Sequence, residues 1–174
     1  MNIREAVLEE HSRMQSDIIS AYIGNRRERF DELMALVFTN KDPLARRAAW
    51  TMGHCCREHP QLLTPHCSSL LKLISDPRTH PSITRNALLV FQTAEIPSDL
   101  RGKLFNLCYD KVDNPDEMAA TRIYAMTILA RICRWEPGLS DEVELLIKQN
   151  LRHSSNGFKG RARHLLNDLR KETD

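Results

Sequence analysis

One arginine recurs along this sequence at a nearly constant interval. Intervals of 38, 37 and 39 residues separate the four members of this column, which are Arg47, Arg85, Arg122 and Arg161. A column of leucines keeps the same period, at Leu33, Leu70, Leu107 and Leu145. A fixed period of this size is the signature of repeat architectures, in which a single unit cannot bury its apolar face without its neighbours. The chain is therefore expected to be a stack of about four structural repeats.

Each period contains two amphipathic segments. The first helices are expected at about 26–38, 65–75, 98–112 and 141–152, and the second helices at about 43–58, 81–94, 115–134 and 157–171. Their apolar residues recur at helical spacing, as at Phe30, Leu33, Met34 and Val37. Between them lie turns rich in Asp, Asn, Ser and Pro, which compete for backbone hydrogen bonds or cannot continue a helix.

The periodicity predicts one all-α domain. Its expected parts are a capping helix over 1–24, which could be broken near His11 and Ser12, and repeats over about 26–60, 64–97, 98–137 and 140–174. Stacked helical hairpins of this kind form a solenoid, and the terminal elements must differ from the rest to close the ends of the core.

Two segments resemble the HEAT repeat. Residues 70–77, LLKLISDP, followed by 83–89, ITRNALL, are similar to its leucine-rich first helix, its Asp-Pro turn and its second helix with an early arginine and a small residue. Residues 42–49, DPLARRAA, match again, whereas Arg122 follows a lengthened turn and the fourth repeat has no Asp-Pro. The resemblance covers about 26–171 and implies a right-handed α-α superhelix of the HEAT or armadillo type.

The whole chain also resembles a group of short bacterial HEAT-like proteins that often carry the label adenylosuccinate lyase. Genuine lyases of that superfamily are much longer and have a Ser-Ser-x-Met-Pro-x-Lys-x-Asn signature loop. Residues 154–159, SSNGFK, share its first two serines and lack its Met-Pro. Lyase activity is therefore not expected.

Composition and charge limit the expected partners, the cellular location and the state of the cysteines. The net charge of +2 is too small to indicate nucleic acid or an anionic membrane as the partner. Neither a signal peptide nor an apolar run of about 18 residues is present, so a cytoplasmic protein without a membrane span is expected. The five cysteines are odd in number and lie in helical patterns, which favours free buried thiols over disulfides.

The arginine column has two possible roles. In HEAT-like proteins the arginine of the second helix commonly pairs with an acidic or carbonyl group in a neighbouring turn, and this structural role is favoured. Alternatively, repeated guanidinium groups in register could bind carboxylates or phosphates along a concave face. Trp50 has the same two options, because it could anchor a ligand in the groove or pack between repeats.

No constellation indicates catalysis or a metal. The most metal-like cluster lacks the paired spacing of a zinc site; it consists of His54, Cys55, Cys56, His59, His66 and Cys67. The known nucleophile and phosphate-binding motifs are absent from the sequence. Neither catalytic residues nor a cofactor is expected.

The sequence therefore predicts a non-catalytic scaffold that binds a protein or peptide on its concave face. The expected binding residues are Arg47, Trp50, Arg85, Arg122 and Arg161. The alternative is nucleic-acid binding, which the resemblance in fold to HEAT-like alkylpurine DNA glycosylases suggests. Those enzymes are longer and use clustered aromatic residues that are not apparent in this sequence. Partner identity and oligomeric state do not follow from the sequence.

Overall fold

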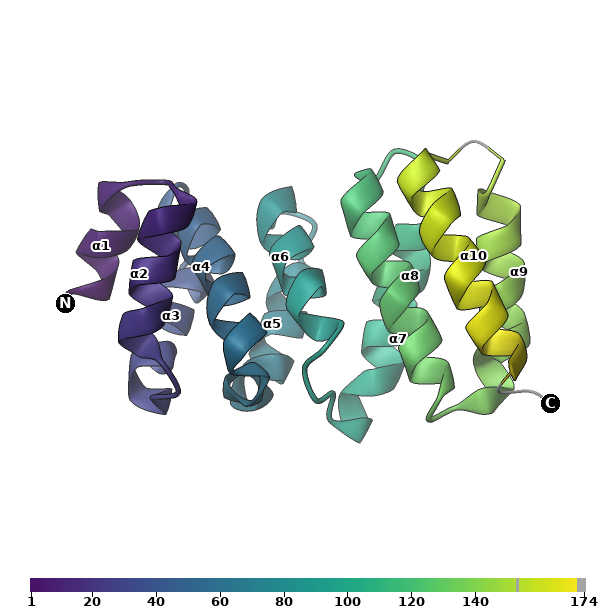
Figure 1. Ribbon diagram of the computed structural model, residues 1–174, viewed down its shortest axis with the longest axis horizontal. Coiled ribbons are helices and arrows are strands. Elements are labelled where there is room, and N and C mark those ends of the chain that lie inside the picture. The colour runs from purple at the N-terminus through teal and green to yellow at the C-terminus, as the bar shows by residue number, and fades with distance from the viewer. Residues whose placement is uncertain (153, 172–174) are drawn as a thin grey trace. The chain divides into compact units, whose positions relative to one another are not determined.

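The computed structural model describes residues 1–152 and 154–171, with side chains to Leu169. Within these ranges the regular structure is helical and contains no strand, which confirms the all-α class (Figure 1). The chain divides into two compact units, Met1–Pro97 and the part that begins at Ser98. The last three residues of the fourth expected repeat, 172–174, lie outside the described residues.

Unit 1 is a two-layered stack of helices. Its elements are α1 Ile3–Glu9, α2 Arg13–Ile23, α3 Arg27–Phe38, α4 Leu44–Glu58, the 3-10 helix η1 Pro60–His66, α5 Cys67–Ile74 and α6 Pro81–Phe91. Helix α4 packs between α2 and α6, and these three form one layer (Figure 1). Helices α3 and α5 form the other layer. Second helices of successive repeats therefore lie side by side, as the period requires.

The N-terminal cap is a pair of helices instead of one continuous helix. Helix α1 ends at Glu9 and α2 begins at Arg13, so the break falls where His11 and Ser12 allowed it. The Ser12 hydroxyl accepts a hydrogen bond of 3.1 Å from the Gln15 amide, which is an N-cap for α2. A serine with this geometry starts a new helix more readily than it continues an old one.

Polar contacts join residues about one period apart. The Asp17 carboxylate lies 2.7 Å from Nδ1 of His54, and the Asp31 carboxylate lies 2.6 Å from Nε2 of His66. Between α2 and α4, the hydroxyls of Ser16 and Thr51 meet at 3.3 Å. These contacts therefore join neighbouring elements whose residues lie about one period apart in the sequence.

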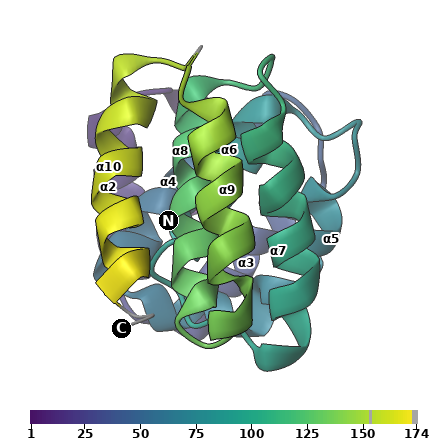
Figure 2. The same ribbon diagram turned by 90° about the vertical axis from the view of Figure 1, so that its right-hand side faces the viewer.

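Unit 2 contains α7 Ser98–Asp113, α8 Ala119–Cys133, the 3-10 helix η2 Pro137–Leu139, α9 Ser140–Asn150 and α10 Asn156–Lys171 (Figure 2). Helix α8 packs against α7 and α10, and α7 also packs against α9. The expected start of α8 at 115 is four residues early. The Asn114 side chain accepts a 3.0 Å hydrogen bond from the Asp116 amide, and this turn delays the helix to Ala119.

The core of each unit is aliphatic. In unit 1 the small residues of α4 let it approach its neighbours, and Ala45, Ala48, Ala49 and Met52 are fully buried. In unit 2, Phe158 is the largest fully buried side chain. Among the described helices, none is both long and apolar enough to cross a membrane.

Candidate binding groove on helices α4 and α6

Arg122 is built into the core of unit 2. Its side chain is only 6% exposed, and its Nε and Nη2 donate to the Val112 carbonyl at 3.0 and 2.8 Å. Nη2 also donates to Oδ1 of Asn150 at 2.6 Å, and Nη1 donates to the Ser154 hydroxyl at 3.3 Å. Burial lowers the pKa of Arg122, and the charge of Asp113 opposes that effect. The guanidinium thus ties the end of α7 to the α9–α10 turn.

Two other members of the arginine column also make contacts between repeats. Nη1 of Arg47 donates to the Leu8 carbonyl in the last turn of α1 at 2.8 Å. Nε of Arg161 donates to the Thr127 hydroxyl on α8 at 3.1 Å. Arginine is well suited to such positions because its planar fork satisfies orphan carbonyls at helix ends. This geometry matches the structural role that the sequence favoured for the column.

Arg85 is different from the rest of the column. It lies half-buried on α6 and has no hydrogen bond or ion pair within the described part of the chain. Arg57, at the end of the neighbouring α4, is exposed and equally without a partner among the described residues. Arg85 and Arg47 belong to unit 1, whereas Arg122 and Arg161 belong to unit 2. Helices α4 and α6 are thus neighbours that each carry a guanidinium group without a partner among the described residues.

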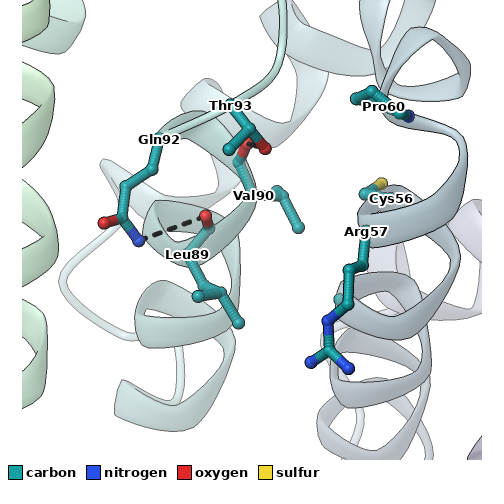
Figure 3. Close-up of a pocket in the computed structure, with 8 residues that line it drawn as sticks. Cys56, Arg57, Pro60, Leu89, Val90, Gln92 and Thr93 are labelled. Atoms are coloured by element: carbon teal, nitrogen blue, oxygen red, sulfur yellow. Dashed lines mark hydrogen bonds between the residues drawn. The ribbon is translucent and has the colours of Figure 1, made fainter.

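A cavity of about 280 Å³ lies between α4 and α6, and its lining defines the α4–α6 groove (Figure 3). One wall consists of Gly53, Cys56, Arg57 and Pro60, and the other consists of Leu89, Val90, Gln92 and Thr93. Cys56 and Val90 are buried, so the floor is apolar, and the Gln92 side-chain amide donates to the Leu89 carbonyl at 3.3 Å. Arg57 is the one charged residue of this lining.

Gly53 sets the depth of the groove. It lies within α4, and a Cβ added there would come 3.6 Å from Cδ2 of Leu89, which is ordinary van der Waals contact. A glycine inside a helix often marks a close approach of neighbouring elements. Sequence reasoning passed over Gly53, Arg57 and Leu89, although a mid-helix glycine with an arginine one turn later was a signal that could have found them.

We expect Gly53→Ala to raise the free energy of unfolding by about 0.5–1 kcal/mol. Alanine lowers the conformational entropy of the unfolded chain and has the better helix propensity, and the site has room for its methyl group. Urea denaturation followed by circular dichroism measures the change. A loss of stability would mean that α4 and α6 pack more tightly at this point than the 3.6 Å contact indicates.

A second cavity, of about 320 Å³, lies on the α2 side of α4. Arg57 lines this cavity as well as the groove, so it stands on the ridge between them. The second lining is polar and includes both Asp17 and Glu58. Because acidic groups occur only on this side of the ridge, the α4–α6 groove is the more electropositive of the two cavities.

Trp50 packs against two imidazoles. Its ring meets His11 edge-on at a centroid distance of 4.5 Å and His54 at 5.6 Å. Desolvation lowers the pKa of His11, and the charges of Arg47 and Arg46 lower it further. The indole is half-buried, so part of it is accessible. Its use as a ligand anchor stays a prediction.

All five cysteines are buried free thiols. In the described chain, no three His, Cys, Asp or Glu side chains gather closely enough to hold a metal ion. Burial raises the pKa of Cys55 to about 11 and that of Cys67 to about 11, and it also raises the pKa of Cys56 and Cys108. Reactive cysteines need the opposite shift, because the thiolate is the nucleophile.

We expect the five thiols to react very slowly with Ellman's reagent in the native chain near pH 8 and completely in concentrated guanidinium chloride. The raised pKa values of four thiols, Cys55, Cys56, Cys67 and Cys108, leave them with almost no thiolate, and burial of all five blocks access to the reagent. The measurement is absorbance against time in both conditions. Rapid reaction of one thiol in the native chain would contradict the buried placement of that residue.

A comparison with protein-family models matches residues 3–168 to one described as a HEAT repeat domain. No curated protein and no solved structure matches the chain significantly.

Proposed function

The chain belongs to the HEAT repeat family, and from that premise we propose that it is a non-catalytic scaffold whose α4–α6 groove binds a peptide segment of a partner protein. Proteins of stacked repeats use the extended surface along one layer of helices for binding. The observation that carries the proposal is Arg57, an exposed guanidinium that has no partner among the residues the structure describes and lies at the rim of an apolar cavity. Of the residues expected from the sequence, Arg47, Trp50 and Arg85 lie on the same two helices.

The size of the groove favours a side chain over a whole cofactor. Small-molecule sites usually have volumes of roughly 300–1,000 Å³ and enclose most of the ligand. The groove, at about 280 Å³, is below that range and open. It suits one apolar side chain of a longer segment, with Gln92 and Thr93 at the rim to meet the peptide backbone. Binding hot spots commonly combine an apolar pocket with an arginine in this way.

Selection from a random peptide display library on the immobilised full chain tests the proposal. The affinity of the selected peptides is then measured by fluorescence polarisation for wild type and for Thr93→Trp, which places a large ring over the groove from an exposed position. The matched control is Ser69→Trp, an exposed position on α5 in the other layer.

We expect Thr93→Trp to weaken binding by about tenfold or more, which corresponds to the loss of one buried apolar side chain. Ser69→Trp should leave the affinity unchanged. Equal affinities for both variants would place the selected peptides elsewhere and overturn the proposal.

A further inference from the structure

The charges on α4 and α6 have one dominant sign. Together these helices carry the arginines Arg46, Arg47, Arg57 and Arg85, and Glu58 is their single acidic residue. Arg46 lies 2.9 Å from the Asp42 carboxylate, and Arg47 donates to the Leu8 carbonyl. Arg57 and Arg85 remain without a partner in the described chain, so their charge is open to a ligand.

Along the two helices, Arg57 and Arg85 lie on opposite sides of the point where Gly53 faces Leu89. Gly53 faces Leu89 across the groove, and four residues later Arg57 shares the groove with Gln92 and Thr93, so α4 and α6 run in the same direction (Figure 1). Arg85 lies one turn before Leu89 and on the same face of α6. At a rise of about 1.5 Å per residue, Arg57 and Arg85 are thus about 12 Å apart along the helices.

An extended peptide matches this spacing. Its alternate side chains point to the same side and lie about 6.6 Å apart. A segment with an apolar residue in the cavity therefore places the side chains two positions away about 6.6 Å along the groove, close to a guanidinium group. Carboxylates are the protein groups that arginine binds best, because the two planar forks form paired, charge-assisted hydrogen bonds.

We infer that the α4–α6 groove binds an acidic peptide segment in which an aliphatic or aromatic residue lies within two positions of Asp or Glu. This inference rests on the proposed function and specifies its ligand. The apolar side chain fills the space over Cys56 and Val90, and the carboxylate pairs with Arg57. Arg85 binds a second acidic residue farther along the segment.

Nucleic acid fits the groove less well. A phosphate backbone needs a continuous basic stripe, and single-stranded bases need exposed aromatic platforms. The groove lining contains one arginine over an apolar floor and no aromatic residue, and the next guanidinium, that of Arg85, lies about 12 Å away along the helices. A peptide with both apolar and acidic side chains fits the apolar floor of the groove and the arginine at its rim.

An arrayed set of synthetic peptides tests the inference with the full chain. Each labelled peptide has Leu, Phe or Ser at its centre and Asp, Lys or Ser at one of the three positions on either side, in a Gly-Ser background. Binding to wild type, Arg57→Glu and Arg57→Gln is measured by fluorescence polarisation, and circular dichroism checks the fold. Arg4→Glu on α1 is the matched control, because it makes the same charge change at an exposed residue outside the groove.

We expect peptides with Leu or Phe and a nearby Asp to bind wild type best. Arg57→Glu should weaken them at least about tenfold and transfer the preference to the Lys peptides, with Arg57→Gln in between. Arg4→Glu should change nothing.

Three outcomes would count against the inference. If Thr93→Trp abolishes binding but Arg57→Glu leaves the charge preference unchanged, the inference fails and the proposed function stands. If no array or selected peptide is sensitive to Thr93→Trp, both fail. If a labelled single-stranded DNA oligonucleotide binds in an Arg57-dependent way and the peptides do not, both fail in favour of nucleic acid.

Discussion

Replacing Arg122 with alanine is expected to lower the free energy of unfolding of unit 2 by about 3–5 kcal/mol. The substitution removes the donors that satisfy the Val112 carbonyl, Asn150 and Ser154, and it leaves a hole beside Phe158. Buried acceptors without a partner keep their full desolvation penalty. Urea denaturation followed by circular dichroism measures the loss, and Trp135 reports on unit 2 by fluorescence because it is that unit's only tryptophan.

Arg161→Ala is the matched control for this prediction. Arg161 belongs to the same sequence column, but it is exposed and has a single hydrogen bond to Thr127. Its removal should cost no more than about 1 kcal/mol. If Arg122→Ala costs as little as Arg161→Ala, the buried guanidinium is not a structural link and a ligand-binding role for Arg122 would regain support.

The second large effect is expected at Phe158, where alanine should lower the free energy of unfolding by about 3–5 kcal/mol. The ring is 1% exposed, and its centroid lies 4.8 Å from the Arg122 guanidinium carbon. Removing it loses both the buried apolar area and the cation–π contact. The measurement is the same denaturation experiment, and Leu145→Ala, at a 54% exposed position on α9, should change stability by less than about 0.5 kcal/mol.

Arg122 and Phe158 should also be coupled. In a double-mutant cycle, the loss for both substitutions together should be smaller than the sum of the single losses by roughly 0.5–2 kcal/mol, because each single change already removes their contact. If the two losses of unfolding free energy simply add, the contact between the Arg122 guanidinium and the Phe158 ring contributes no stability of its own.

The fold was predictable because the stacking itself creates the sequence period. Asp17 meets His54 and Asp113 meets Asn150, each pair 37 residues apart, so the spacing of these contacts equals the period seen in the sequence. The helix boundaries that the sequence misplaced depend on local turn chemistry. At Asn114 the side-chain turn delays the start of α8, whereas the N-cap at Ser12 divides the capping segment where the sequence had allowed a break.

The candidate site was only partly predictable. The arginine column is regular because three of its members make contacts between repeats, and regularity by itself does not separate a structural arginine from a free one. Arg57 lies outside the column, and it belongs to the candidate site because it lines the same cavity as Gly53 and Leu89, which are 36 residues apart. Which residues of α4 and α6 face each other depends on the axial position of one helix relative to the other, and tertiary packing sets that position.

Photo-crosslinking tests most directly the claim that α4 and α6 hold the partner. A peptide that binds the full chain is synthesised with a benzophenone amino acid at its apolar position, irradiated in the complex and mapped by mass spectrometry. The account predicts crosslinks to the groove lining, chiefly at Leu89, Val90 and Thr93. Crosslinks confined to α3 and α5, and competed by unlabelled peptide, would contradict it and assign binding to the other layer of unit 1.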